Sequence, residues 1–391
     1  MNAAVLRDAR KPRFSALPPL SLYVHLPWCM KKCPYCDFNS HERAGTLPEK
    51  EYLQALTRDL EAALPSVWGR RIHSIFIGGG TPSLFSAAAI DELLANVRAR
   101  LPVEPDAEIA LEANPGTAEA ARFRAYSAAG VNRLSVGVQS FDDSMLKSLG
   151  RIHGADEARR AIGMALAAFG NVNVDLMYGL PGQTLAMARA DIEEGARSGA
   201  PHVSAYQLTI EPNTVFFSHT PKLPEHEATA DMQLMAEETL AQAGFGHYET
   251  SAFARPGHRC RHNLNYWEFG DYLGIGAGAH GKLSFAGRVT RHERIKQPRE
   301  YMRENGGVAE RVVKASELPF EFMLNALRLV EGFPAELFEA RCGLPLSLVQ
   351  RGLAAAEGRG LIERTAARIR PTERGRHFLN DLVALFLPPQ K

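Results

Sequence analysis

The sequence predicts an α/β protein with a parallel sheet and helices outside it. From Leu22 to about Pro212, short apolar runs rich in β-branched residues alternate with longer stretches of helical period. Six such units in a row favour parallel pairing, because each return to the same sheet edge needs a crossover connection. The sheet is either doubly wound or curled into a partial (β/α)6 barrel. In both cases functional residues should follow the carboxyl ends of the strands.

The predicted strands and helices alternate without long gaps. Strands are expected at 21–27, 71–80, 107–115, 131–140, 171–182 and 202–212. Helices between them include 48–64, 87–101, 117–130 and 184–200, and a long amphipathic helix is expected at 225–245. A stretch rich in glycine and aromatic residues then extends to about residue 281.

The C-terminal part of the chain has a different pattern. Helices are expected at 320–333, 334–343 and 346–360, followed by a β-hairpin over 361–375 and a last helix. This order is typical of an α-rich, winged-helix-like domain. Its Arg residues are nearly matched by Glu, which favours a packing role over nucleic-acid binding. We therefore expect a lead-in at 1–20, a partial barrel at 21–215, its completion at 216–310 and the winged-helix-like domain at 311–391.

Composition excludes several classes of protein. The net charge of +1 provides no field that would attract nucleic acid, and no apolar run is long enough to span a bilayer. The first twenty residues lack the apolar centre of a secretory signal, and five cysteines, an odd number, do not form a disulfide framework. These features predict a cytoplasmic protein. The oligomeric state stays open, with a homodimer as one option.

Three of the five cysteines lie together in "CMKKCPYC", as Cys29, Cys33 and Cys36. Thiolates suit zinc, copper(I) or an iron–sulfur cluster. A four-iron cluster held by three cysteines would keep one iron open for an external ligand. The alternatives are a zinc site completed by a distant His or Cys, and three unligated thiols.

Polar and glycine residues follow the other predicted strands at the same end of the sheet. The Gly78–Thr81 stretch is either a tight turn or a close backbone approach to a ligand. Glu112 alone could be a solvated loop residue. Together with Gln139, Arg151 and Asp175, it could instead bind an amino acid joined to a nucleoside.

These motifs resemble the radical S-adenosylmethionine (SAM) superfamily, which combines Cys-x3-Cys-x-aromatic-Cys, a Gly-Gly-Gly-Thr-Pro loop and a βα barrel. More closely, "YVHLPWC", "GGGTP", "SVGVQS", "DLMYGLPGQT" and "HNLNYW" resemble its coproporphyrinogen oxidase-like family over nearly the whole chain. The resemblance implies that Cys29, Cys33 and Cys36 hold a [4Fe–4S] cluster whose open iron takes the cofactor's amino and carboxylate groups. The other cofactor contacts that it implies are Tyr23, Tyr35, Gly79, Gly80, Thr81, Glu112, Gln139, Arg151 and Asp175.

Two branches of that family differ in function. The oxygen-independent coproporphyrinogen III oxidases resemble Cys-x3-Cys-x2-Cys-x-Cys and carry a longer N-terminal arm. Here the last Cys position is Phe38, and only the twenty residues 1–20 precede the first predicted strand. The heme-chaperone branch carries His-Asn-x-x-Tyr-Trp, found here from His262 to Trp267. All three features favour the heme-chaperone branch.

His262 is the candidate heme-iron ligand, and Tyr266 and Trp267 offer flat faces for a porphyrin. The alternative is that these side chains only pack. Cys260 is a second candidate ligand or a buried thiol, and His25 is a supporting donor or a core residue.

The favoured hypothesis is a radical SAM heme chaperone that binds a [4Fe–4S] cluster, SAM and heme, and hands heme to an unidentified acceptor protein. The rival hypothesis is an oxidase that decarboxylates two propionates of coproporphyrinogen III. A structural zinc module is the third.

Overall fold

The structure is a computed structural model that describes residues 11–117, 119–304 and 307–388. Residues 1–10 of the predicted lead-in and Ala118 of the predicted helix at 117–130 lie outside the described residues. So do residues 305–306 and 389–391, which fall in the last two predicted segments.

The predicted six-stranded parallel core is confirmed. Its strands follow one another in the sheet in chain order, each parallel to the next. They are β1(Leu20–Leu26), β4(Ile72–Gly79), β5(Val103–Ala113), β6(Arg133–Gln139), β7(Val172–Tyr178) and β8(His202–Gln207). Every position of β1 except Tyr23 is buried, as expected for a strand covered on both faces.

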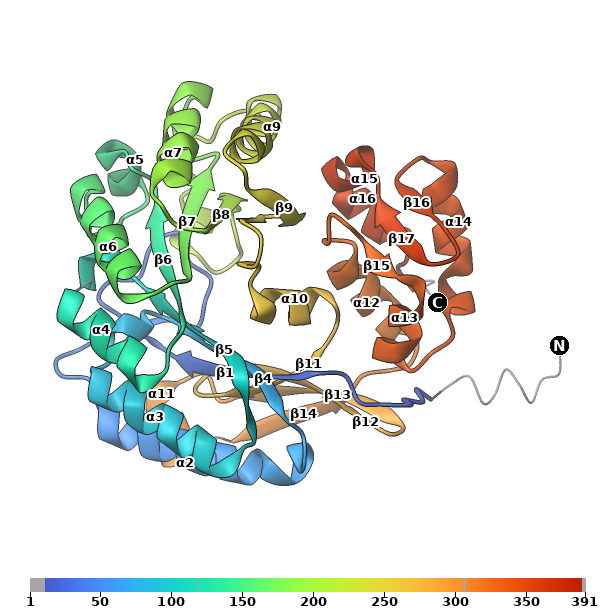
Figure 1. Ribbon diagram of the computed structural model, residues 1–391, viewed down its shortest axis with the longest axis horizontal. Helices are drawn as coiled ribbons and strands as arrows, with labels where there is room; N and C mark the ends of the chain where they lie inside the picture. The colour runs from blue at the N-terminus through green and yellow to red at the C-terminus, as the bar shows by residue number, and fades with distance from the viewer. Residues whose placement is uncertain (1–10, 118, 305–306, 389–391) are drawn as a thin grey trace.

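Helices cover the outer face of this curved sheet (Figure 1). The larger ones are α2(Glu49–Val67), α3(Ala87–Arg100), α4(Ala120–Ala129), α6(Ala155–Ala168), α7(Leu185–Arg197) and α9(His226–Gln242). Shorter helices are α5(Asp143–Ser148), α8(Val215–Ser218), α10(Arg261–Trp267) and α11(Pro298–Arg303). Within the described residues the sheet ends at two different edge strands, so the barrel is partial, as predicted.

The sheet continues beyond the predicted core on both sides. On one side, β11(Asp271–Ile275) pairs in parallel with β1 and is followed by antiparallel strands β12(His280–Phe285), β13(Arg288–Arg294) and β14(Val308–Val312). On the other, β10(Ala252–Ala254) and β9(Gly246–Glu249) add to β8.

The first of these extensions, which begins with β11, was not predicted because a glycine interrupts its strand pattern. A Cβ at Gly274 would lie 2.0 Å from the carbonyl oxygen of His280, so only glycine lets β11 and β12 approach this closely. The position of β11 therefore depends on this close backbone contact with β12 and on its pairing with the distant β1, not on a local apolar period.

The C-terminal part has its own hydrophobic cluster, in which the Phe322 ring meets Phe333 and Phe338 edge-on at 5.0 and 5.1 Å. Its elements are α12(Leu318–Ala326), β15(Phe333–Pro334), α13(Ala335–Cys342), α14(Gln350–Gly358), the hairpin β16(Ile362–Arg364) and β17(Arg368–Pro371), α15(Glu373–His377) and α16(Leu379–Ala384). The helices with a terminal hairpin agree with the predicted winged-helix-like architecture. No helix in the described ranges is long and apolar enough to cross a membrane.

Candidate functional site

The loop that carries the three cysteines leaves the carboxyl end of β1. A short parallel pair, β2(Trp28–Cys29) with β3(His41–Glu42), joins the two ends of the loop. A turn in which the Cys36 N–H donates to the Cys33 carbonyl oxygen at 3.1 Å shapes its middle. The loop is thus held by backbone contacts of its own.

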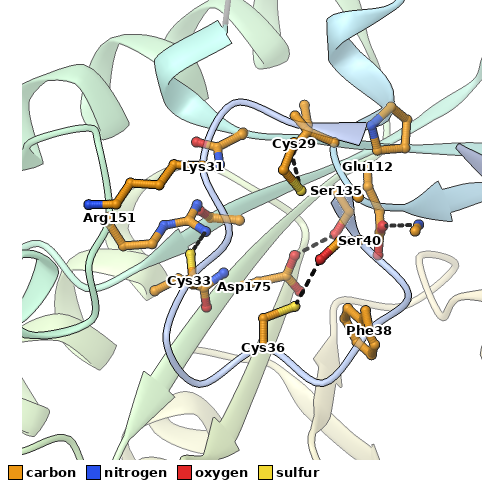
Figure 2. Close-up of a pocket in the computed structure, with 18 of the residues that line it drawn as sticks. Cys29, Lys31, Cys33, Cys36, Phe38, Ser40, Glu112, Ser135, Arg151 and Asp175 are labelled. Atoms are coloured by element: carbon orange, nitrogen blue, oxygen red, sulfur yellow. Dashed lines mark hydrogen bonds between the residues drawn. The ribbon is translucent and has the colours of Figure 1, made fainter. Parts of the chain in front are cut away.

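The three thiols surround one cavity, and each contacts a different neighbour (Figure 2). The sulfur of Cys29 accepts from Thr81 Oγ1 at 3.5 Å, that of Cys33 accepts from Arg151 Nη1 at 3.7 Å, and that of Cys36 lies 3.7 Å from Ser40 Oγ. No group of three or more His, Cys, Asp or Glu side chains, among those the structure describes, is arranged to hold a single metal ion.

We call this space the thiol cavity. It encloses about 780 Å³ of empty space, including its open mouth. Its wall brings together most of the residues that the sequence singled out: Cys29, Cys33, Tyr35, Cys36, Gly79, Gly80, Thr81, Glu112, Gln139, Arg151 and Asp175. The carboxyl ends of the parallel strands therefore converge as predicted.

The glycine loop after β4 approaches the chain that leads into the cysteine loop. A Cβ at Gly80 would lie 2.6 Å from the carbonyl oxygen of Trp28. Gly79 has φ +118°, and a Cβ there would lie 2.7 Å from the His25 ring. These glycines are therefore required by packing beside Cys29, in addition to any contact with a ligand.

Two carboxyl groups face the thiol cavity. Glu112 accepts from the Gly79 N–H at 3.1 Å, and burial, reinforced by the nearby Asp175, raises the pKa of Glu112 to about 8. Asp175 accepts from Ser135 Oγ and Asn173 Nδ2, both at 2.7 Å, and burial raises its pKa as well. A bound cation would stabilise both carboxylates.

Arg151 and Gln139 also lie in the wall of the thiol cavity. Arg151 Nη2 donates to the Gly137 carbonyl oxygen at 2.7 Å, while its buried Nε has no hydrogen-bond partner. Gln139 has φ +72° at the end of β6, and its Oε1 accepts from Tyr206 OH at 2.7 Å. A buried N–H group without a partner is expected at a site where a bound ligand supplies the hydrogen-bond acceptor.

Tyr23 and His262 do not line the thiol cavity. The Tyr23 ring stacks on Phe76 at 5.8 Å, and its hydroxyl lies 2.7 Å from His25 Nδ1. The His262 ring also stacks on Phe76, at 4.5 Å, and His262 is only 5% exposed. Burial lowers the pKa of His262 to about 3, so its ring is neutral. The Cys260 thiol is also buried, where it donates to Glu108 Oε1 at 3.4 Å.

Part of the wall was not predicted from the sequence. Lys31, Phe38, Ser40, Ser135 and Tyr206 also line the thiol cavity. The alternation of "HVSAYQ" in β8 could have identified Tyr206, because its side chain shares a face with Ser204. Lys31 and Ser40 lie in loops, where the sequence gives no period to follow.

Comparisons with known proteins agree with this architecture. Residues 23–194 match the model of the radical SAM superfamily, and residues 313–378 match that of the HemN C-terminal domain. The chain superposes on the solved structure of the coproporphyrinogen III oxidase HemN from Escherichia coli with a TM-score of 0.80, over 99% of this chain and 93% of that one. That pair is 23% identical, so the match concerns the fold.

Curated relatives are considerably more similar in sequence. The heme chaperone HemW of Escherichia coli K12 is 50% identical over 95% of this chain and 99% of its own length, and that of Haemophilus influenzae is 48% identical over 95% and 98%. The mitochondrial radical S-adenosyl methionine domain-containing protein 1 of Bos taurus is 40% identical over 78% of this chain and 73% of its own. These relatives confirm the branch that Phe38 and the "HNLNYW" motif favoured. The chain belongs to the HemW heme-chaperone family of the radical SAM superfamily.

Proposed function

We propose that this chain holds a [4Fe–4S] cluster on Cys29, Cys33 and Cys36, binds SAM in the thiol cavity, and carries heme to an acceptor protein. The single observation that carries the first two parts is the convergence of three thiols, the Gly79–Thr81 turn and two carboxyl groups on one cavity. Family membership carries the third, since the two most similar bacterial relatives named above are heme chaperones.

The thiols fit a cluster in their chemistry. Burial raises the pKa of Cys29 and of Cys36, and cluster iron would stabilise the thiolate form of both. Each sulfur has a different neighbour around the cavity, which suits a cluster with one corner per thiol better than a single ion. A three-thiol set also agrees with Phe38 in place of a further cysteine.

The remaining wall fits a zwitterionic, sulfonium-bearing nucleoside. Glu112 and Asp175 would pair with its cationic and hydroxyl groups, and the free Nε of Arg151 would meet an acceptor. When bound, SAM and a reduced cluster supply one-electron cleavage of a carbon–sulfur bond. The chain's own task is to orient the ligand and to exclude water around it.

The test is an anaerobic reconstitution with iron and sulfide. We expect about four irons per chain, from the cluster type that three thiols favour, and loss of that iron in the Cys29→Ser and Cys36→Ser variants. Cys342→Ser is the matched control, because that thiol lies in the C-terminal cluster. A colourless product that binds zinc and no iron would contradict the proposal.

A second experiment separates the chaperone from the oxidase. The reconstituted chain is given reductant, SAM and coproporphyrinogen III, and in a parallel sample it is titrated with hemin. We expect a saturable Soret shift and no steady formation of protoporphyrinogen. Steady formation of protoporphyrinogen would establish the oxidase instead.

Heme delivery is tested by mixing the hemin-loaded chain with a heme-free b-type cytochrome. Direct transfer makes the rate rise with acceptor concentration, whereas passive release gives a rate independent of it. A rate independent of acceptor concentration across several such cytochromes would contradict the transfer step.

A further inference from the structure

A second cavity lies beside the thiol cavity, and Phe38 and Ser40 line both. We call it the histidine cavity, because His25, His41 and His280 lie in its wall. It encloses about 1170 Å³ of empty space, including its open mouth, which is large enough for a ligand of porphyrin size.

The histidine cavity offers flat apolar faces. Tyr23, Phe38 and Tyr266 contribute aromatic rings to its wall, and the Phe38 side chain is 61% exposed. Tyr266 is the residue of the "HNLNYW" motif that reaches this wall. A large aromatic ligand would cover these faces and remove apolar surface from water.

The rim of the histidine cavity carries two lysines. Lys32 Nζ donates to the Phe38 carbonyl oxygen at 3.1 Å, and Lys296 Nζ lies 3.1 Å from Glu293 Oε1 with its side chain 65% exposed. Asp37 is the acidic residue among the described wall residues. Both lysines can turn toward a ligand's carboxylates at little cost, because their present contacts face solvent.

The three histidines of the wall differ in how their ring nitrogens are used. His25 has Nδ1 2.7 Å from Tyr23 OH and Nε2 2.9 Å from the Asn39 carbonyl oxygen. His41 contacts Asn39 Oδ1 at 3.3 Å and the backbone of Lys296. The His280 side chain is 62% exposed, and its Nε2 lies 3.9 Å from Glu293 Oε1, beyond hydrogen-bond distance. His280 therefore has a nitrogen free to bind a metal.

His262 occupies a different position. Its ring is packed between Phe76 at 4.5 Å and Tyr266 at 4.9 Å, and it lines neither cavity. An iron ligand must reach the porphyrin centre, and moving this ring there would break both contacts. Its place behind Tyr266 makes it a support for the cavity wall.

We propose that heme is seated in the histidine cavity with His280 as its iron ligand. The porphyrin lies against Phe38 and Tyr266, and its propionates point toward Lys32 and Lys296. The bond to iron forms by donation of a lone pair from a ring nitrogen of His280, with no change in oxidation state. This inference rests on the proposed heme-carrying function, and it places the heme edge next to the thiol cavity.

The experiment is a hemin titration of the full chain without its cluster, followed by absorption and electron paramagnetic resonance. His280→Ala should weaken hemin binding at least tenfold and remove the signature of a histidine ligand. Added imidazole should restore that signature, because it can occupy the space left by the ring. His226→Ala is the matched control, since this exposed residue of α9 lies outside both cavities.

The outcomes distinguish the inference from the function on which it rests. If the wild-type chain binds no hemin either without its cluster or after reconstitution, the heme-carrying function itself fails. If the wild type binds hemin and His280→Ala keeps its affinity and spectrum, only the assignment of His280 is overturned. The assignment of His280 is also overturned if the histidine signature is lost instead in His41→Ala, or in a His262→Gln variant shown by circular dichroism to be folded.

Discussion

Glu112 and Asp175 are two carboxyl groups that β5 and β7 bring to one enclosed cavity. A sheet alone gains nothing from this arrangement, because each carboxyl makes ionisation of the other less favourable. Ser135 and Asn173 satisfy Asp175, but Glu112 has only the Gly79 N–H. A buried carboxyl group with a single hydrogen-bond donor, such as Glu112, is typical of a site that binds a cation.

Glu112 therefore makes stability depend on pH in a defined direction. Its pKa rises on folding from an ordinary 4.5 to about 8, so between these values the folded chain holds a proton that the unfolded chain has lost. The free energy of unfolding falls as the pH rises through this window. The Glu112→Gln variant has no buried carboxyl group to ionise, so this loss of stability is absent. Its amide oxygen can still accept the hydrogen bond from the Gly79 N–H.

We expect Glu112→Gln to raise the Tm of the cluster-free chain by about 2–6 °C at pH 8.5 and by much less at pH 5. Differential scanning fluorimetry at both values measures this. Glu92→Gln, an exposed change on α3, is the control for losing a charge. An equal gain at both pH values, or a loss at pH 8.5, would show that Glu112 does not carry this cost.

At the residue scale, the sequence predicted part of the thiol cavity because Cys29 and the Gly79–Thr81 turn lie at or just after the carboxyl ends of parallel strands, which meet at one edge of the sheet. Glu112 and Asp175 instead lie within β5 and β7, and their side chains reach the same cavity from inside those strands. The order of the residues does not determine whether a side chain points into the cavity or away from it. Tyr23 and His262 both stack on Phe76, and only the tertiary packing determines these contacts.

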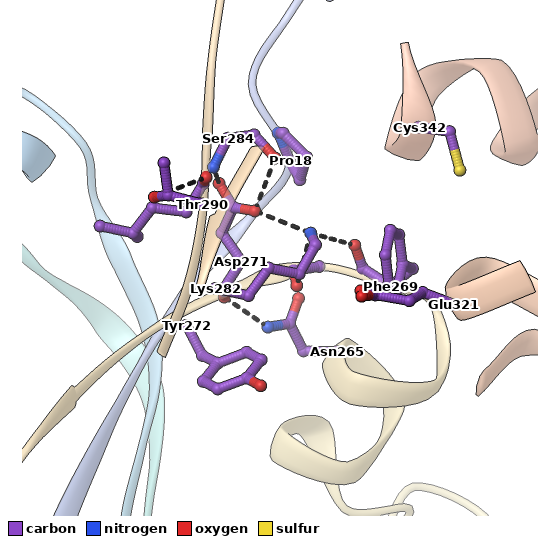
Figure 3. A network of polar contacts seen from close by, with 12 residues as sticks. Pro18, Asn265, Phe269, Asp271, Tyr272, Lys282, Ser284, Thr290, Glu321 and Cys342 are labelled. Atoms are coloured by element: carbon purple, nitrogen blue, oxygen red, sulfur yellow. Dashed lines mark hydrogen bonds and ion pairs between the residues drawn. The ribbon is translucent and has the colours of Figure 1, made fainter. Parts of the chain in front are cut away.

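At the scale of elements, a buried polar network fastens α10 to the sheet (Figure 3). Asn265 Nδ2 donates to Ser21 Oγ and to the Asp271 carbonyl oxygen, both at 2.9 Å. Lys282 Nζ lies 2.9 Å from Asp271 Oδ1, and Arg70 Nη1 lies 2.8 Å from Asp271 Oδ2. The helix that carries Tyr266 is thus held by contacts with β1 and β11, and Lys282 of β12 joins the network through Asp271.

Lys282→Met tests this network. The Lys282 side chain is 1% exposed, and its removal would leave Asp271 buried with Arg70 as its remaining ion-pair partner in the described residues. We expect a loss of about 3–5 kcal/mol in the free energy of unfolding, measured by urea denaturation. The control is Lys314→Met, whose 79% exposed side chain should contribute less than about 1 kcal/mol. If the two variants were equally stable, the network would be dispensable.

The same elements show where prediction from sequence ends. The six βα units were predictable because each carries its own apolar period. Strands β11 to β14 were not, since β11 contains Gly274, which the sequence pattern does not assign to a strand, and its place in the sheet comes from parallel pairing with the distant β1. Strands β12 to β14 then follow β11 as successive antiparallel partners.

At the scale of the molecule, the barrel and its antiparallel extension contribute different cavities. The thiol cavity is built from β1, β4 to β8 and their loops, whereas His280 and Lys296 of the histidine cavity come from β12 and the segment after β13. The expected domain boundary between 215 and 216 would divide these two contributions, and it stays a prediction. The arrangement suggests that cluster binding and heme binding can be lost independently.

We expect the Cys29→Ser/Cys33→Ser/Cys36→Ser variant to bind no iron–sulfur cluster. It should still bind hemin within about threefold of the wild-type affinity, a difference in binding free energy of less than about 1 kcal/mol. None of the three thiols lines the histidine cavity. Lys32, Asp37 and Phe38 do lie on the same loop, but the β2–β3 pair and the Cys33–Cys36 turn hold that loop through backbone hydrogen bonds. These bonds remain when sulfur is replaced by oxygen.

The converse variant, His280→Ala, should keep a full iron and sulfide content while hemin binding weakens. Iron and sulfide analysis and hemin titration on both variants complete the comparison. If the triple variant kept its circular dichroism but lost hemin, the cluster would have to organise the loop that carries Phe38. The two cavities would then form one coupled site, in which heme is accepted only by the cluster-loaded chain.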